Sequence, residues 1–164
     1  MGSQTSGHAA FRMSAELSPG RLREPIWPDG IHPRSFGPED GHALHALLEH
    51  GYRRGGGSVA AFETWLTQMT TDEEFDPQLW FLAEAERMLV GAILCWTSAF
   101  VKDLVVHESW RRRGLAEALL LHAFNALSAR GATTVELKVE AGNHAAVRVY
   151  ERLGMQFAQR LDRA

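Results

Sequence analysis

The 164-residue sequence has little of several features that mark specialised classes of protein. Its one cysteine, Cys95, excludes an internal disulfide, and the apolar segment 93–96 around it predicts a buried side chain rather than a nucleophile. The longest apolar runs, such as 89–96, are far shorter than the ~20 residues that span a bilayer. A net charge of -3 excludes a strongly basic surface, so we expect neither a nucleic-acid partner nor attachment to a membrane.

Length and composition indicate one folded domain with an N-terminal extension. Hydrophobic residues make up 45% of the chain and charged residues 23%, a balance typical of globular domains. Residues 1–30 are rich in Ser, Gly, Pro and Arg and hold no apolar signal segment. We therefore expect them to be a flexible arm or a remnant of an expression tag, and we expect a cytoplasmic location. The domain itself is expected to cover residues 31–164.

The hydrophobic periodicity after residue 30 alternates between strand and helix patterns. The stretch 38–40 predicts entry into one helix, and Ser58 predicts the N-cap of a second helix. The remaining expected elements are strands at 31–36, 79–83, 88–96 and 100–106, a helix at 114–130, a strand at 133–139, a helix at 143–153 and a last strand at 155–161. This order predicts an α/β sandwich with a mixed sheet.

Three histidines interleave with leucines in the first predicted helix. His42, His45 and His50 invite a metal-site interpretation, but no cysteine or carboxylate stands at a matching ligand spacing. Solvated or partly buried histidines are the better interpretation, and we predict no metal site.

The most informative segment runs from a predicted buried strand into the start of a helix. Arg111, Arg112 and Arg113 precede Gly114 and Ala116. The first turn of a helix has unpaired N–H groups and a partial positive charge, and small residues let a ligand approach its backbone. This turn can therefore bind a pyrophosphate. Considered alone, it can equally be a solvated arginine run at an ordinary helix start.

Two segments share the spacing of a known pair of motifs. The first motif, (Gln or Arg)-x-x-Gly-x-(Gly or Ala), is matched by Arg111, Gly114 and Ala116. The second, Asn-x-x-Ala-x-x-x-Tyr-x-x-x-Gly, is matched by Asn143, Ala146, Tyr150 and Gly154. In this order, and about 27 residues apart, the segments resemble the Gcn5-related N-acetyltransferase (GNAT) superfamily. The clear resemblance covers residues 79–161.

The resemblance implies a fold and a cofactor site. The sheet would be mixed and mostly antiparallel with flanking helices, and the strand at 100–106 would splay from the strand at 133–139 to admit acetyl-CoA, with no metal. The residues implied in cofactor binding are Leu104, Val105 and Val106 at the pantetheine arm, Arg111, Arg112, Arg113, Gly114, Leu115, Ala116 and Glu117 at the pyrophosphate turn, and Asn143, Ala146 and Tyr150 on the following segment.

The resemblance also implies catalytic roles. The Tyr150 hydroxyl would donate a proton to the departing CoA thiolate, a general-acid role that requires hydrogen-bond reach and a dry pocket. A backbone amide on the splayed strand, at Val106, would stabilise the oxyanion. Without the motif, Tyr150 would be interpreted as a core tyrosine of an amphipathic helix.

The general base is not evident from the motifs. The two positions at which GNAT relatives carry a base glutamate correspond here to Lys138 and Phe100. Asp103, His107 and Glu140 remain as candidates, and Asp103 shares a strand face with Val105, from which it could act through a water. A purely structural carboxylate is the alternative for Asp103.

The chain ends soon after Gly154, so we expect the final strand to be short or missing. The sheet edge would then stay open or be covered by the N-terminal arm or by a partner chain, which allows a homodimer. Residues 25–30 and the later motifs together resemble the second half of tandem GNAT proteins related to mycothiol synthase.

Three functions fit these features. The first is an N-acetyltransferase that acts on a small-molecule or peptide amine. The second is a catalytically silent acyl-CoA-binding module, which the missing base favours. The third is an interaction domain without a ligand.

Overall fold

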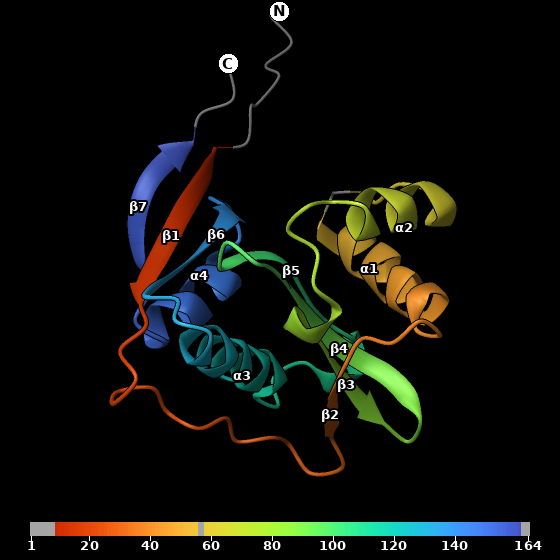
Figure 1. Cartoon of the computed structure of the whole chain (residues 1–164), viewed down its shortest axis with the longest axis horizontal. Helices are drawn as coiled ribbons and strands as arrows, with labels where there is room; N and C mark the ends of the chain where they lie inside the picture. Colours follow the sequence, from red (N-terminus) through yellow and green to blue (C-terminus); the bar gives the residue numbers. More distant parts are fainter. Residues whose placement is uncertain (1–8, 56–57, 162–164) are drawn as a thin grey trace, which may run out of the picture.

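The computed structural model describes residues 9–55 and 58–161, which form a seven-stranded sheet with helices on both faces (Figure 1). The helices and strands, in chain order, are β1 (Ala10–Glu16), β2 (His32–Ser35), α1 (Gly41–Gly55), α2 (Phe62–Thr70), β3 (Trp80–Ala85), β4 (Met88–Trp96), β5 (Phe100–Val106), α3 (Leu115–Ala129), β6 (Thr134–Glu140), α4 (His144–Arg152) and β7 (Gln156–Leu161). The expected α/β class with a mixed, mostly antiparallel sheet is confirmed.

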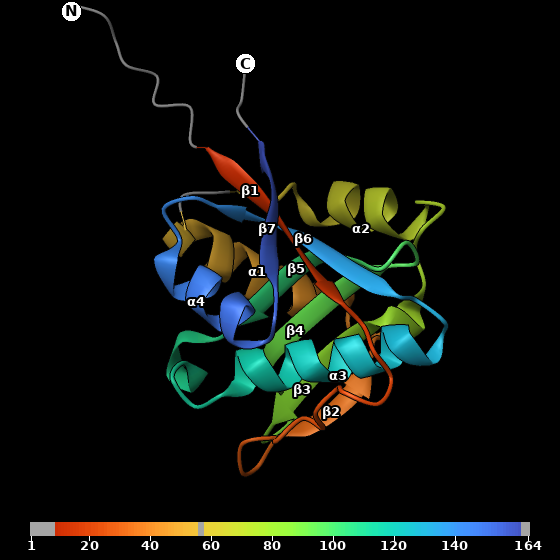
Figure 2. The same cartoon turned by 90° about the vertical axis from the view of Figure 1, so that its left-hand side faces the viewer.

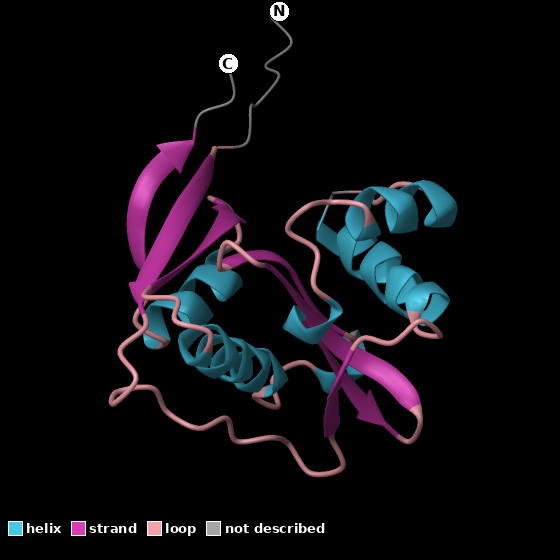
Figure 3. Ribbon diagram, in the orientation of Figure 1, coloured by secondary structure: helices cyan, strands magenta, loops and turns pink. Residues whose placement is uncertain are grey.

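The sheet divides between β5 and β6, which are the only parallel neighbours among the described strands. The strand order is β2-β3-β4-β5-β6-β1-β7, and the other neighbours are antiparallel. The β5–β6 ladder contains only the pairs Phe100↔Glu136 and Val101↔Leu137. Beyond Val101 the strands diverge, so that β2–β5 form one arm of the sheet and β6, β1 and β7 the other (Figure 3). The predicted splay is therefore confirmed.

Each face of the sheet carries its own core, because successive side chains of a strand point to opposite faces. On one face, α1 and α2 cover Trp80, Leu82 and Leu94. On the other face, α3 and α4 pack with Phe81 and Ile93 (Figure 2). None of the helices in the described ranges is long and apolar enough to cross a bilayer.

The first two helices begin later than the sequence predicts. α1 begins at Gly41, so the stretch 38–40 lies before the helix. α2 begins at Phe62, and its N-cap residue Ala61 provides no side-chain hydrogen bond, so the assignment of Ser58 as the N-cap is wrong.

A buried histidine contacts the segment that precedes α2. The His45 side chain is 7% exposed, and its Nε2 lies 2.7 Å from Ala60 O, which holds the segment before α2 against α1. His42 stacks on Phe62 with ring centroids 3.7 Å apart. These two histidines therefore have packing roles.

β1 corrects the domain boundary expected at residue 31. Residues Ala10–Glu16 form a complete strand between β6 and β7, and the Met13 side chain is fully buried. The expectation of a flexible arm is wrong for these residues, because alternating apolar side chains bury one face of the strand in the core. Residues 1–8 lie outside the described residues.

The last strand is present and pairs with β1. The N-terminal segment, rather than a partner chain, thus covers the edge of β6. β7 is therefore the edge strand on this side of the sheet, and its Phe157 side chain is 53% exposed.

α1 lies so close to β5 that one helical position requires glycine. A Cβ atom at Gly51 would lie 2.7 Å from Val105 Cγ2, well inside van der Waals contact. Gly51 therefore sets the distance between α1 and the strand that carries Asp103.

We predict that Gly51→Ala destabilises the protein. Overpacking against Val105 should cost about 1–3 kcal/mol, partly offset by the roughly 1 kcal/mol by which alanine exceeds glycine in helix propensity. In a Val105→Ala background the clash is absent, so the same substitution should be neutral or stabilising. Urea unfolding of the four proteins measures this coupling. An equal cost in both backgrounds would contradict the close contact.

Candidate functional site

A β-bulge in β5 places the side chains of Val101 and Asp103 on opposite faces of the sheet. β5 pairs with β4 through Leu94↔Asp103 and then Cys95↔Val101, which leaves Lys102 as an extra residue. Val101 packs in the α3 core, whereas Asp103, two positions later, is paired with a residue of the α1 core. Without the extra residue, the period of two would place Val101 and Asp103 on the same face.

The backbone of β5 presents alternate residues to the gap beside β6. Hydrogen-bonded and non-hydrogen-bonded pairs alternate along an antiparallel ladder. His107 N–H donates to Val90 O at 2.7 Å, so Val106 belongs to a non-hydrogen-bonded pair and its N–H and C=O point away from β4. The same alternation points the groups of Leu104 toward the gap and those of Val105 toward β4. Of the three residues predicted at the pantetheine arm, Leu104 and Val106 can therefore offer backbone groups.

The start of α3 presents unpaired amides. The first helical hydrogen bond runs from Ala118 N–H to Gly114 O at 3.0 Å, so the N–H groups of Leu115, Ala116 and Glu117 precede it. Gly114 has a φ of 85°, a left-handed conformation that favours glycine, and no side chain caps the helix. These amides and the helix dipole can bind an anion.

Three exposed arginines precede these amides. Arg111 Nε donates to Val106 O at 3.4 Å, and the Arg113 guanidinium lies 4.7 Å from the centre of the Trp110 ring. Within the described ranges, no carboxylate forms an ion pair with Arg111, Arg112 or Arg113. Their charge is therefore available to phosphate oxygens.

Glu117 is the acidic residue of the first turn of α3. Its carboxylate oxygens lie 3.6 Å from Arg23 Nη2 and 3.8 Å from Arg152 Nη2. These two cations offset the negative charge that Glu117 would otherwise place beside an anion.

Asn143 and Ala146 make a helix cap. Asn143 is the N-cap of α4, and its Oδ1 accepts a hydrogen bond from Ala146 N–H at 3.2 Å. The structure thus gives these two motif residues a local role in starting α4, the helix that positions Tyr150.

Tyr150 lies on the buried side of α4. Its side chain is 8% exposed, and burial raises the pKa of its hydroxyl to about 12. In the described part of the chain the hydroxyl has no hydrogen-bond partner. The phenol therefore stays protonated at neutral pH and can donate to a ligand.

Asp103 forms a buried polar pair that the sequence did not reveal. Tyr52 of α1 donates a short hydrogen bond to Asp103 Oδ1, and Lys102 Nζ lies 3.8 Å from Asp103 Oδ2. Asp103 is 8% exposed, and burial raises its pKa, opposed by the charge of Lys102 and the hydrogen bond from Tyr52. Burial also raises the pKa of Tyr52. A carboxylate with a raised pKa is suited to accept a proton near neutral pH.

The other two base candidates lie in different surroundings. His107 Nδ1 accepts a hydrogen bond from Ser109 N–H at 3.1 Å, and its ring stacks on His50 with centroids 5.5 Å apart. Glu140 is exposed at the end of β6. In residues 9–55 and 58–161, no group of three or more His, Cys, Asp or Glu side chains could hold a metal ion.

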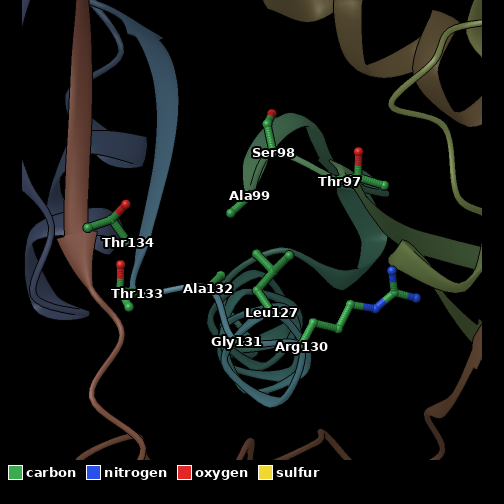
Figure 4. Close-up of a pocket in the computed structure, with 9 residues that line it drawn as sticks. All are labelled: Thr97, Ser98, Ala99, Leu127, Arg130, Gly131, Ala132, Thr133 and Thr134. Carbon is green, nitrogen blue, oxygen red and sulfur yellow. The ribbon is translucent and has the colours of Figure 1, made fainter.

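Two cavities lie near β5. One, of about 210 Å³, lies between α1, α2 and β5 and includes Tyr52 and Asp103 in its lining. The other, of about 370 Å³, is lined by residues 97–99, 127 and 130–134, at the end of the sheet where β5 and β6 are paired (Figure 4). Only the first adjoins the diverging part of β5.

Comparisons with known proteins agree with these features. The profile of the acetyltransferase (GNAT) family matches residues 42–155. A crystal structure of a GCN5-related N-acetyltransferase from Sphaerobacter thermophilus is similar with a TM-score of 0.82 and 32% identity, over 93% of this chain and 49% of that one.

Two relatives of this chain are acetyltransferases that act on different acceptors. Mycothiol acetyltransferase of Streptomyces avermitilis is 34% identical over 150 residues, which cover 81% of this chain and 45% of that protein. The [ribosomal protein bS18]-alanine N-acetyltransferase of Salmonella typhimurium is 37% identical over 79 residues, 47% of this chain and 53% of that protein. The chain thus spans about half the length of the mycothiol acetyltransferase, as the resemblance to one half of a tandem protein predicts.

We predict that Asp103→Asn changes the pH dependence of stability. Because the pKa of Asp103 is raised in the folded chain, its favourable contribution is complete below the ordinary aspartate pKa of about 3.9 and is lost as the pH rises through the raised value. Asparagine keeps an acceptor for Tyr52 but does not ionise. The variant should therefore gain stability over the wild type as the pH rises from about 4 to about 8.

Urea unfolding of both proteins across this pH range provides the measurement. Glu140→Gln, which alters an exposed carboxylate on β6, is the matched control. Parallel pH profiles for Asp103→Asn and the wild type would contradict the prediction.

Proposed function

The chain belongs to the acetyltransferase (GNAT) family, and on that premise we propose that it transfers an acetyl group from acetyl-CoA to a primary amine of a small molecule or a peptide. One observation carries the proposal. The strand β5, free of β6 beyond Val101, leads directly to an uncapped helix start preceded by three arginines without ion pairs in the described ranges.

The cofactor arm and the pyrophosphate would bind to successive parts of this segment. The backbone groups of Leu104 and the carbonyl of Val106 would pair with the pantetheine amides as a neighbouring strand would. The amides of 115–117 and the guanidinium groups of Arg111, Arg112 and Arg113 would hold the pyrophosphate. Asn143 and Ala146 would act by setting the start of α4.

The chemistry is a direct transfer between two bound substrates. The amine nitrogen forms a bond to the thioester carbonyl carbon, the C–S bond breaks, and the carbonyl oxygen carries negative charge in between. Val106 N–H stabilises that oxyanion. Asp103 accepts the proton that the ammonium group loses before attack, directly or through a water, and Tyr150 gives its proton to the CoA thiolate. The second proton, which the nitrogen loses as it becomes an amide, returns Tyr150 to its protonated form.

The choice of Asp103 as base rests on its surroundings. It is the most buried of the three candidate bases, and it lies on the strand that would carry the thioester. The raised pKa brings it closer to the value that favours proton transfer at neutral pH. The second candidate function, a silent acyl-CoA-binding module, keeps the cofactor site and lacks turnover.

Replacement of the three arginines should weaken acetyl-CoA binding. Changing Arg111, Arg112 and Arg113 together to Gln is expected to raise the Kd by about tenfold or more, because charge-assisted contacts to phosphate are lost. Isothermal calorimetry measures the effect. S-acetylpantetheine, which lacks the pyrophosphate, should bind equally to both proteins, and Arg21→Gln should bind acetyl-CoA like the wild type. An unchanged Kd for the triple variant would place the pyrophosphate elsewhere.

Loss of the Tyr150 hydroxyl should slow turnover without weakening cofactor binding. We expect Tyr150→Phe to lower kcat for CoA release on an amine panel by about a hundredfold, the size of a general-acid contribution, with the acetyl-CoA Kd within about twofold. Thiol release gives the rate and calorimetry gives the Kd. If the wild type binds acetyl-CoA but no amine raises CoA release above background, the silent module is the correct function.

A further inference from the structure

The cavity of about 210 Å³ between α1, α2 and β5 is a second concave site beside the proposed thioester position. Its volume equals about seven water molecules at ~30 Å³ each, below the roughly 300 Å³ at which drug-sized pockets begin. His45 holds one wall in place through its hydrogen bond to Ala60 O at 2.7 Å. A compact ligand, or one compact part of a larger ligand, fits such a space.

One negative and one positive charge line this cavity. They are Asp103 and Lys102, with Asp103 Oδ2 3.8 Å from Lys102 Nζ. Tyr52 occupies Oδ1 through its hydrogen bond, so Lys102 Nζ is the cation beside Oδ2, and a ligand ammonium group would take its place there. The Lys102 side chain is 43% exposed, so its ammonium group can move to meet an anion.

The remaining lining is mostly apolar. Leu48 and Trp65 form part of it, together with Val59, Ala60 and Met69. Trp65 and Met69 are 5% and 8% exposed, so they belong to the core and give a fixed apolar wall. Ser58 and Gln68 are the neutral polar side chains at this site besides Tyr52.

We propose that this cavity is the acceptor site and that it takes a free α-amino acid with an apolar side chain. The ammonium group would lie at Asp103 Oδ2, the carboxylate at Lys102 Nζ, and the side chain against Trp65 and Met69. This assignment rests on the proposed function, which supplies the acetyl donor. In an α-amino acid one carbon atom joins the ammonium and carboxylate groups, so its two opposite charges lie close together, as those of Lys102 and Asp103 do.

The position also suits the chemistry. Asp103 is next to Leu104, whose backbone groups face the gap proposed for the pantetheine arm. An ammonium nitrogen at Asp103 would therefore lie beside its base and on the strand that would carry the thioester. After loss of one proton to Oδ2, the nitrogen lone pair attacks the carbonyl carbon, the thiolate leaves with the proton of Tyr150, and the second nitrogen proton returns to Tyr150.

Two other acceptor types fit the charges less well. A polyamine or aminoglycoside brings further positive charges toward Lys102, and the cavity lining offers only one carboxylate. A peptide N-terminus has an amide where the amino acid has a carboxylate, so Lys102 would have no partner.

The test compares leucine with leucinamide, which keeps the ammonium group and the side chain and lacks the carboxylate. CoA release from acetyl-CoA is followed for the full chain and for Lys102→Gln. We expect leucine to be acetylated, and Lys102→Gln to raise its KM by about tenfold while changing that of leucinamide by no more than about twofold. Any effect of Lys102→Gln on the pKa of Asp103 should change the KM of both acceptors equally, so the comparison of the two acceptors removes it.

A pair of variants on α2 tests the location. Gln68→Phe narrows the cavity and should reduce leucine turnover, whereas Thr67→Phe, at an exposed neighbouring position outside the lining, should not. Acetyl-CoA affinity should be unaltered in both. Equal effects of Lys102→Gln on the two acceptors, or no leucine turnover by a protein that binds acetyl-CoA, would overturn the amino-acid assignment. Failure to bind acetyl-CoA would instead overturn the proposed function.

Discussion

One extra residue in β5 determines the arrangement of the site. The bulge at Lys102 breaks the period of two along the strand, so Val101 and Asp103 face opposite cores. The carboxyl group thereby lies on the α1 side, while the amides of Leu104 and Val106 remain in the plane of the sheet and point to the gap. A proton-accepting side chain and a cofactor-binding backbone can share one strand because side chains and backbone groups point in perpendicular directions.

The gap beside β5 has a topological origin. β5 and β6 are parallel and joined through α3, whereas all their other partners in the described sheet are antiparallel neighbours. The β5–β6 pair does not need a continuous ladder, because α3 packs on β4 and β5 and shares one hydrophobic core with Val135, Leu137 and Val139 of β6. The unpaired backbone at the gap is therefore supported by the core beneath it rather than by a ladder.

Much of the fold could be predicted from periodicity, and two spaced motifs predict a cofactor turn at the helix start that the structure leaves without a side-chain cap. Asp103 is recognised from its strand position, but its partner Tyr52 is not, because 51 residues separate them. The close approach of α1 to β5, which Gly51 permits, is not evident from the sequence. β1 was missed although Met13 and Ala15 alternate correctly, because the Pro- and Gly-rich stretch that follows is typical of a loose arm. Long-range pairing leaves no local signal.

The placement of β1 between β6 and β7 affects the order in which the sheet can form. Arg12 of β1 bonds to Glu136 of β6, 124 residues later in the chain. At the ~10 residues per second typical of synthesis, β1 emerges on the order of ten seconds before its first partner. Strands β3, β4 and β5 can pair during that interval. β5, which contains the bulge at Lys102, therefore forms early, and the pairing of β1 with β6 and β7 completes the sheet last.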